Sequence, residues 1–238
     1  MFGLRKYISE FENSYLKTVF LYVVMISGGL LQITGIFDNI LSIISSLVMM
    51  LLSIWLGYEI VYFYYRIHKH MAQTRRQIYR ALLWLFSVFS LSLLIENMGV
   101  HSGLIFGNYS YGDVLWPSIS RVPVVIGFAW INTLIPSMIL ASVLSRNKWV
   151  NNYFIVPLLT GSLMVIFDMV LEPAAIKLNF WYWTDGAIPI QNYLAWFILG
   201  CAFAYLGNRL NVFKPGYPKH IYHAYFSQLM YFSLILLK

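Results

Sequence analysis

Charged residues are scarce in this chain. Only 11% of its 238 residues are Asp, Glu, Lys or Arg, whereas soluble proteins average roughly 25%. Hydrophobic residues make up 60% of the sequence and aromatic residues 18%. This composition excludes an ordinary soluble domain and indicates an integral membrane protein.

Cysteine and histidine are rare as well. Cys201 is the single cysteine and lies within an apolar segment. One cysteine excludes an intramolecular disulfide, and it does not indicate whether the protein is in a reducing or an oxidising compartment. The five histidines are His68, His70, His101, His220 and His223. A membrane di-iron hydroxylase needs many histidines in clustered boxes, whereas here only His101 is expected at one membrane face and the other four at the opposite face. We therefore expect no metal and no other cofactor.

Long apolar segments are abundant. Seven are long enough to cross a hydrocarbon core of about 30 Å as helices. They cover residues 19–36, 40–65, 81–98, 122–144, 153–171, 190–210 and 221–237. Since the connecting segments are too short for a second domain, we predict an all-α polytopic membrane protein that forms a single domain with about seven transmembrane helices.

The basic residues favour one membrane face. Of the 16 Lys and Arg residues, only Arg121, Lys177 and Lys238 fall on the predicted outer side, which leaves 16 − 3 = 13 for the other. These are Arg5, Lys6, Lys17, Arg66, Lys69, Arg75, Arg76, Arg80, Arg146, Lys148, Arg209, Lys214 and Lys219. By the positive-inside rule the N-terminus is predicted to be cytoplasmic and the C-terminus outside. The net charge of +7 thus has a topological explanation, and no nucleic-acid partner is expected.

Three acidic residues lie within the apolar segments near the predicted outer side. Asp168 and Glu172 are four residues apart and stack on one helix face. Because the residue before a proline disfavours helical backbone, Pro173 predicts that this helix ends near Glu172. At 1.5 Å per residue, Glu96 and Asp168 each lie about 22 Å from the start of their spans. Three acids at one depth, with few cations nearby, indicate a functional site.

Two outer loops rich in glycine and aromatic residues follow these acids. The first begins at Gly99, where glycines are predicted to break the helix, and the second covers residues 173–189. We expect a polar chamber beneath an aromatic lid. Its candidate substrate-binding residues are Trp130, Asn132, Asn192, Trp196, Trp181, Trp183, Tyr109 and Tyr111.

Each of these features also has an ordinary structural interpretation. Loop Trp and Tyr residues are common in an interfacial belt, and Asn132 suits a hydrogen bond between helices. His101 fits a residue at headgroup level. Glu59, seven residues before Arg66, is expected to be paired or to extend toward the cytoplasmic surface.

Residues 96–196 resemble a known family of carotenoid biosynthesis proteins that includes the carotenoid 1′,2′-hydratases. The resemblance rests on Glu96-x-x-Gly99-x-x-x-Gly103-x-x-Phe106-Gly107-x-Tyr109-x-Tyr111, on Pro123 followed by Trp130, and on Asp168-x-x-x-Glu172-Pro173 leading to Trp181-x-Trp183 and Pro189-x-x-Asn192-x-x-x-Trp196. The family pattern often has Asp where this chain has Glu172, a difference that keeps the charge and lengthens the side chain. The resemblance implies a lipophilic acyclic carotenoid as substrate, a bacterial or archaeal cytoplasmic membrane as location, and other carotenoid enzymes as candidate partners.

The resemblance further implies that water adds across the terminal double bond of the carotenoid to give a tertiary alcohol. Such an alkene must be protonated by a positioned acid, and Asp168 and Glu172 suit a pair that shares one proton. Asp168 is the predicted donor, tuned by Glu172 and Glu96, because it lies one turn deeper in apolar sequence.

The tryptophans and amides have complementary predicted roles. The faces of Trp130, Trp181, Trp183 and Trp196 would stabilise the tertiary cation. Water held by Asn132, Asn192 or the remaining carboxylate would then capture it.

Two alternatives remain open at this point. A Mg²⁺-dependent membrane isoprenoid transferase would use Asp168 and Glu172 as half of a carboxylate site, but it is expected to have two acidic motifs and a cytoplasmic site. A proton-coupled transporter would use Glu96 and Asp168 as a proton relay, although the two halves of the sequence show no convincing repeat.

Overall fold

The structure is a computed structural model, and it describes residues 2–67, 71–145, 152–212 and 216–238. Within these ranges it contains seven helices: α1 (Phe2–Thr34), α2 (Asp38–Ile67), α3 (Met71–Ser102), α4 (Val125–Leu144), α5 (Asn152–Lys177), α6 (Ile190–Arg209) and α7 (Lys219–Ile235). Four short strands accompany them: β1 (Tyr109–Tyr111), β2 (Ser118–Ile119), β3 (Val122–Pro123) and β4 (Trp181–Trp183). The predicted all-α fold class is confirmed.

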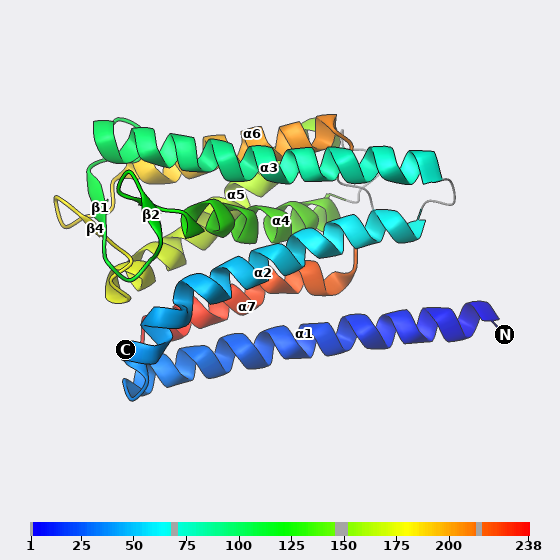
Figure 1. Cartoon of the computed structure of the whole chain (residues 1–238), viewed down its shortest axis with the longest axis horizontal. Coiled ribbons are helices and arrows are strands. Elements are labelled where there is room, and N and C mark those ends of the chain that lie inside the picture. Colours follow the sequence, from blue (N-terminus) through cyan, green and yellow to red (C-terminus); the bar gives the residue numbers. More distant parts are fainter. Residues whose placement is uncertain (1, 68–70, 146–151, 213–215) are drawn as a thin grey trace.

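Consecutive helices run in opposite directions, so the N-terminus and the C-terminus lie at opposite ends of the bundle (Figure 1). Six helices among the described residues, α1 to α6, are long and apolar enough to cross a membrane. The seventh predicted span corresponds to α7, which has 17 residues and packs along α1, α4 and α5. This alternation agrees with the predicted order of spans.

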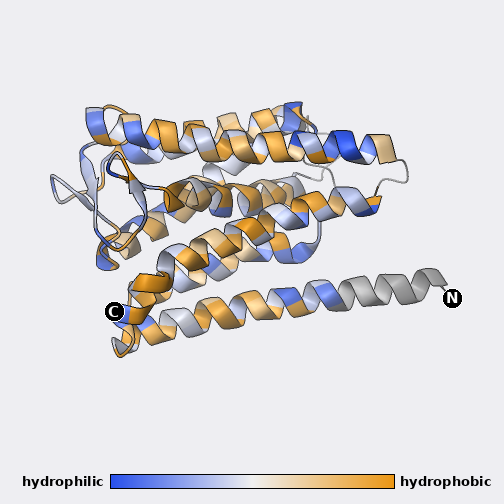
Figure 2. Ribbon diagram, viewed as in Figure 1, coloured by the Kyte–Doolittle hydropathy of each residue, from blue (hydrophilic) through white to orange (hydrophobic). Residues whose placement is uncertain are grey.

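Polar residues gather at the two ends of the bundle, and apolar residues dominate the middle of the helices (Figure 2). Many large apolar side chains along α1 and α2 are exposed, as expected for surfaces that face lipid. Lys69, Arg146, Lys148 and Lys214, the histidines His68 and His70, and the side chains of Arg5 and Lys6 lie outside the described part of the chain. The cytoplasmic placement of the N-terminus stays a prediction from the basic residues.

Helix α4 is the central element of the bundle. It packs against α2, α3, α5 and α7, and 83% of the residues in its most hydrophobic stretch are buried inside the protein. A helix that is apolar all round is expected in such a position. The polar residues of α4 are therefore held by neighbouring helices rather than by solvent.

Two helices extend further than predicted. A glycine ends α3 as expected, but the helix continues through Gly99 to Ser102 and ends where Gly103 adopts a φ of +66°. The predicted end of α5 near Glu172 is wrong, since the helix continues past Pro173 to Lys177 and includes the buried Ala174 and Ala175. A proline removes only one backbone donor, so the helical hydrogen bonds of the residues that follow it can still form.

The actual stop of α5 lies at Asn179. Its φ is +58°, its N–H donates to the carbonyl of Ile176, and the N–H of Phe180 donates to the carbonyl of Ala175. This is the Schellman arrangement, in which Asn is the usual substitute for glycine. The chain leaves the helix here and enters β4 directly.

Strands β1 and β4 join the two predicted outer loops into one small antiparallel sheet at the end of the bundle (Figure 1). Tyr109 pairs with Trp183, and Tyr111 pairs with Trp181. Alternate residues of a strand point to the same face, so these four aromatic side chains share the face that covers the helix ends.

Candidate active site

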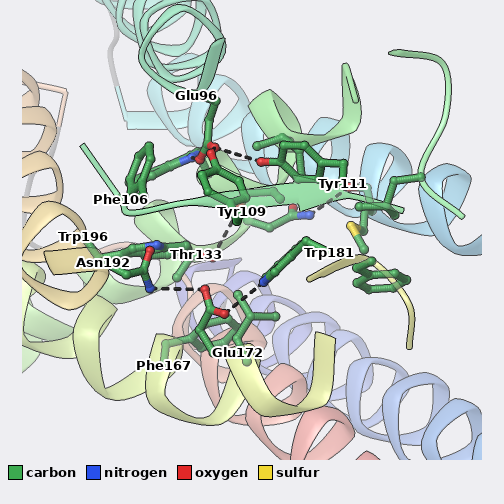
Figure 3. Close-up of a pocket in the computed structure, with 18 of the residues that line it drawn as sticks. Glu96, Phe106, Tyr109, Tyr111, Thr133, Phe167, Glu172, Trp181, Asn192 and Trp196 are labelled. Carbon is green, nitrogen blue, oxygen red and sulfur yellow. Dashed lines mark hydrogen bonds between the residues drawn. The ribbon is translucent and has the colours of Figure 1, made fainter. Parts of the chain in front are cut away.

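A cavity of about 80 Å³ lies beneath the β1–β4 sheet and is lined by side chains from the sheet and from the surrounding helices (Figure 3). Ten of the eleven predicted site residues line it: Glu96, Tyr109, Tyr111, Trp130, Asn132, Glu172, Trp181, Trp183, Asn192 and Trp196. The eleventh, Asp168, is completely buried and is not part of the cavity wall. Residues from six separate elements thus meet at one place, although the sequence separates them by up to 100 positions.

Glu96 of α3 forms one acidic wall of the cavity. Its Oε2 accepts hydrogen bonds from the phenol of Tyr109 at 2.5 Å and the phenol of Tyr111 at 2.8 Å. Its Oε1 accepts from the indole N–H of Trp130 at 3.0 Å. Three neutral donors therefore hold a carboxyl group that is 6% exposed.

Glu172 of α5 forms the second acidic wall. Its Oε2 accepts hydrogen bonds from the indole N–H groups of Trp181 at 2.9 Å and Trp183 at 2.8 Å. Since these indoles pair in register with Tyr111 and Tyr109, one small sheet positions donors for both acids. Strand β1 provides two phenol donors to Glu96, and strand β4 provides two indole donors to Glu172.

Asn192, in the first turn of α6, connects Asp168 with Glu172. Its Nδ2 lies 2.7 Å from Oδ2 of Asp168 and 3.2 Å from Oε1 of Glu172. The two acids therefore occupy one face of α5, as their spacing predicts. Oδ1 of Asp168 is buried and has no hydrogen-bond partner among the described residues.

The three acids are held without ion pairs in the described part of the chain, where the ion pairs involve Glu59 and Asp38 instead. Burial raises the pKa of the Tyr109 phenol above its ordinary value, and the neighbouring Glu96 raises it further. Burial likewise raises the pKa of Tyr111. Both phenols therefore stay protonated and act as donors.

Aromatic and apolar side chains complete the cavity. The rings of Trp130 and Trp196 stack with centroids 4.5 Å apart and planes 19° from parallel. Phe106, Phe167 and Leu171 add apolar surface. The cavity thus combines an apolar lining with carboxyl groups on two walls, which suits an apolar group that must receive a proton.

The donors of the cavity wall are concentrated on one oxygen of each glutamate. Both indole N–H groups point at Oε2 of Glu172, and two phenols point at Oε2 of Glu96. A cation that bound these two oxygens would have to displace the N–H and O–H donors.

Some predicted candidates lie elsewhere. His101 is exposed, its Nδ1 lies 2.8 Å from the carbonyl oxygen of Asn97, and it does not line the cavity. Glu59 is buried and paired, as one interpretation of the sequence expected, but its partners are Lys17 and His220.

Eleven further residues line the cavity without having been predicted as site residues, and Gln228 and Met49 are among them. Gln228 comes from α7 and Met49 from α2. A signal for Gln228 exists, since a glutamine inside an apolar helix needs a buried partner. The sequence contains no signal for Met49, because nothing distinguishes it from the other apolar residues of its span.

Comparisons with known proteins place most of the chain in one family. A family model described as "Carotenoid biosynthesis protein" matches residues 37–237, which leaves α1 outside the match. A bisanhydrobacterioruberin hydratase from Haloarcula japonica is 28% identical over 125 residues, which is 51% of this chain and 42% of that relative. The match thus covers less than half of the relative's length. No solved structure matches this chain.

Proposed function

Because the chain belongs to the carotenoid biosynthesis protein family, we propose that it adds water to the terminal 1′,2′ double bond of an acyclic carotenoid. The family itself establishes a role in carotenoid biosynthesis. The similar protein from Haloarcula japonica carries the name of a hydratase, and the chemistry of the cavity supports the same reaction here.

The observation that carries the proposal is a set of three buried carboxyl groups bonded to neutral donors around an apolar cavity. An ionised carboxylate in such surroundings is costly unless hydrogen bonds or cations compensate it. A proton shared among these groups relieves that cost. The same proton is what an isolated alkene needs in order to form a cation.

The hydrogen bonds suggest where this proton resides. Glu172 accepts three N–H bonds, which favour its ionised form, whereas Asp168 accepts one and keeps Oδ1 without a partner among the described residues. Asp168 is thus the acid of the pair, in line with its predicted role. Because it lies outside the cavity wall, we assign Glu172 the task of passing the proton to the alkene carbon.

The resulting tertiary cation would lie among π-systems. Trp130 and Trp196 line the cavity as a stacked pair, and the rings of Tyr109 and Trp183 lie 5.2 Å apart on its wall. Aromatic faces attract cations by their quadrupole. A cavity of about 80 Å³ suits only the end of a carotenoid, so the polyene extends away from it toward lipid.

The test is expression of the chain in cells that accumulate lycopene or another acyclic carotenoid. We expect a product heavier by one water that carries ¹⁸O from labelled water and forms without O₂. As a matched pair, Asp168→Asn removes the proposed acid, whereas Asp185→Asn alters an exposed loop carboxyl outside the cavity. Label from O₂, or no hydrated product from well-expressed wild-type protein, would contradict the proposal.

A further inference from the structure

Pro136 lies inside the central helix α4. A proline has no N–H, so it leaves the carbonyl four residues earlier without its helical partner. That carbonyl belongs to Asn132, and the side-chain Nε2 of Gln228 donates to it at 3.3 Å. The same Nε2 donates to the carbonyl of Ala224 at 2.9 Å. Gln228 therefore fixes α7 to the point where proline interrupts α4.

The side chain of Asn132 is also fixed. Its Nδ2 donates to the carbonyl of Met49 on α2 at 2.9 Å, which determines the orientation of the amide. Its Oδ1 is buried and has no hydrogen-bond partner in the described part of the chain. An unpaired buried acceptor is costly, and this one belongs to a residue of the cavity wall.

Gln228 offers a second acceptor at the same wall. Because its amide nitrogen donates to two backbone carbonyls, Oε1 is the polar atom of this side chain that remains to accept a further donor. Asn132 is 3% exposed and Gln228 is 7% exposed, so neither amide is hydrated by bulk solvent. Two amide oxygens on side chains that line the same cavity suit a small donor such as water, which needs two to four polar partners.

We propose that Asn132 and Gln228 form the binding site for the water molecule that captures the carotenoid cation. This inference rests on the proposed hydration and assigns its nucleophile a place. Both O–H bonds of the water would be directed at amide oxygens, which leaves an oxygen lone pair for the cationic carbon.

The step balances without any further reactant. The carboxyl proton forms the new C–H bond, and the electron pair of the double bond is consumed in forming it. A lone pair of water then forms the C–O bond. The resulting oxonium ion loses one proton to the carboxylate pair, which restores the starting acid.

The acidic walls are less suited to this role. The carboxyl oxygens of Glu96 and Glu172 already accept from indoles, phenols or Asn192. Asn192 uses its Nδ2 for Asp168 and Glu172 and is tied to the proton-donating pair. Water at Asn132 and Gln228 is held by groups that take no part in protonation, so the two steps have separate residues.

This separation gives a test in deuterated water. A cation that is formed but not captured loses a proton again, and recovered substrate then gains deuterium at the terminal group. We expect Asn132→Leu and Gln228→Met to lower hydration by about tenfold or more, while deuterium entry into recovered substrate stays at or above the wild-type rate. Both rates are measured by mass spectrometry of carotenoids from the same membranes.

The control is Ser137→Ala, which changes another buried polar residue of α4 that does not line the cavity. It should leave both rates unchanged. Gln228→Met keeps the side-chain length and guards against a folding defect in Asn132→Leu. Unchanged hydration in both variants, or parallel loss of hydration and deuterium entry in both at normal abundance, would overturn the assignment. Failure of the wild type to hydrate or exchange any acyclic carotenoid would instead overturn the proposed function itself.

Discussion

Two regions of this protein bury carboxyl groups and treat them in opposite ways. Glu59 on α2 is 2% exposed and lies 2.5 Å from Nζ of Lys17 and 3.2 Å from Nε2 of His220. Glu96 and Glu172 are equally buried, but their partners are phenols, indoles and an amide. One region pairs its acid with a lysine and a histidine, and the other surrounds its acids with neutral donors.

The difference separates a structural carboxylate from carboxyl groups that exchange protons. A cation beside Glu59 favours its ionised form, so this acid is a poor proton donor. Neutral donors solvate a carboxylate without adding positive charge, so the proton stays available. Lys17 belongs to α1, which lies outside the family match, and its ion pair with Glu59 connects α1 to α2, which lies within that match.

The largest effect that this comparison predicts is on catalysis. Asp168→Asn keeps the size and hydrogen bonding of the side chain and removes the acid, so hydration should fall by about 10² to 10⁴, the range typical of general acids. The measurement is the initial rate of product formation in membranes that contain equal amounts of folded protein. A well-inserted variant with a near-parental rate would move the acid role to Glu96 or Glu172.

The sequence predicts this region well because the relevant signals are local. Asp168 and Glu172 share a helix face by their spacing, and the depth argument brings Glu96 to the same cavity. Each of these inferences needs only helix geometry and the thickness of a membrane. Tyr109, Tyr111, Trp181 and Trp183 are expected in two outer loops, and the sequence does not predict their pairing as two strands.

The remaining features depend on packing between distant segments. Glu59 is 42 positions from Lys17 and 161 from His220. The basic residue nearest to it in the sequence is Arg66, so the sequence suggested a different partner. Gln228 acts through a carbonyl that Pro136 releases on another helix. Helix α5 continues past Pro173, and the Ala174 and Ala175 that follow are buried against other parts of the protein. Hydropathy and spacing do not determine which helices become neighbours.

The second predicted effect is on stability and should occur only at Glu59. Glu59→Gln leaves Lys17 and His220 without their carboxylate, and breaking a fully buried pair costs about 3 to 5 kcal/mol. Because Lys17 is 28% exposed, water recovers part of that cost, and we expect a loss of about 1 to 3 kcal/mol. Hydration per folded molecule should stay at the wild-type level.

The measurement is the midpoint of thermal unfolding in detergent. Asp38→Asn is the matched control, because it removes an ion pair with Lys238 at 2.6 Å in which both side chains are substantially exposed. Such a pair contributes about 0 to 1 kcal/mol, so its midpoint should barely change. A loss of activity per folded molecule in Glu59→Gln would show that the two regions are not independent.

The smallest predicted effect distinguishes the two acidic walls from each other. Trp183→Phe removes one N–H donor from Glu172, and Tyr111→Phe removes one O–H donor from Glu96, while each acid keeps two other donors. A hydrogen bond to a charged group is worth about 1.5 to 3 kcal/mol. If Glu172 passes the proton, Trp183→Phe should lower the hydration rate about tenfold, and Tyr111→Phe should lower it by roughly threefold or less. Both substitutions keep an aromatic ring in place, so the two variants can be compared directly. The measurement is the initial rate of hydration at equal protein abundance. A larger loss of rate in Tyr111→Phe would assign proton transfer to Glu96.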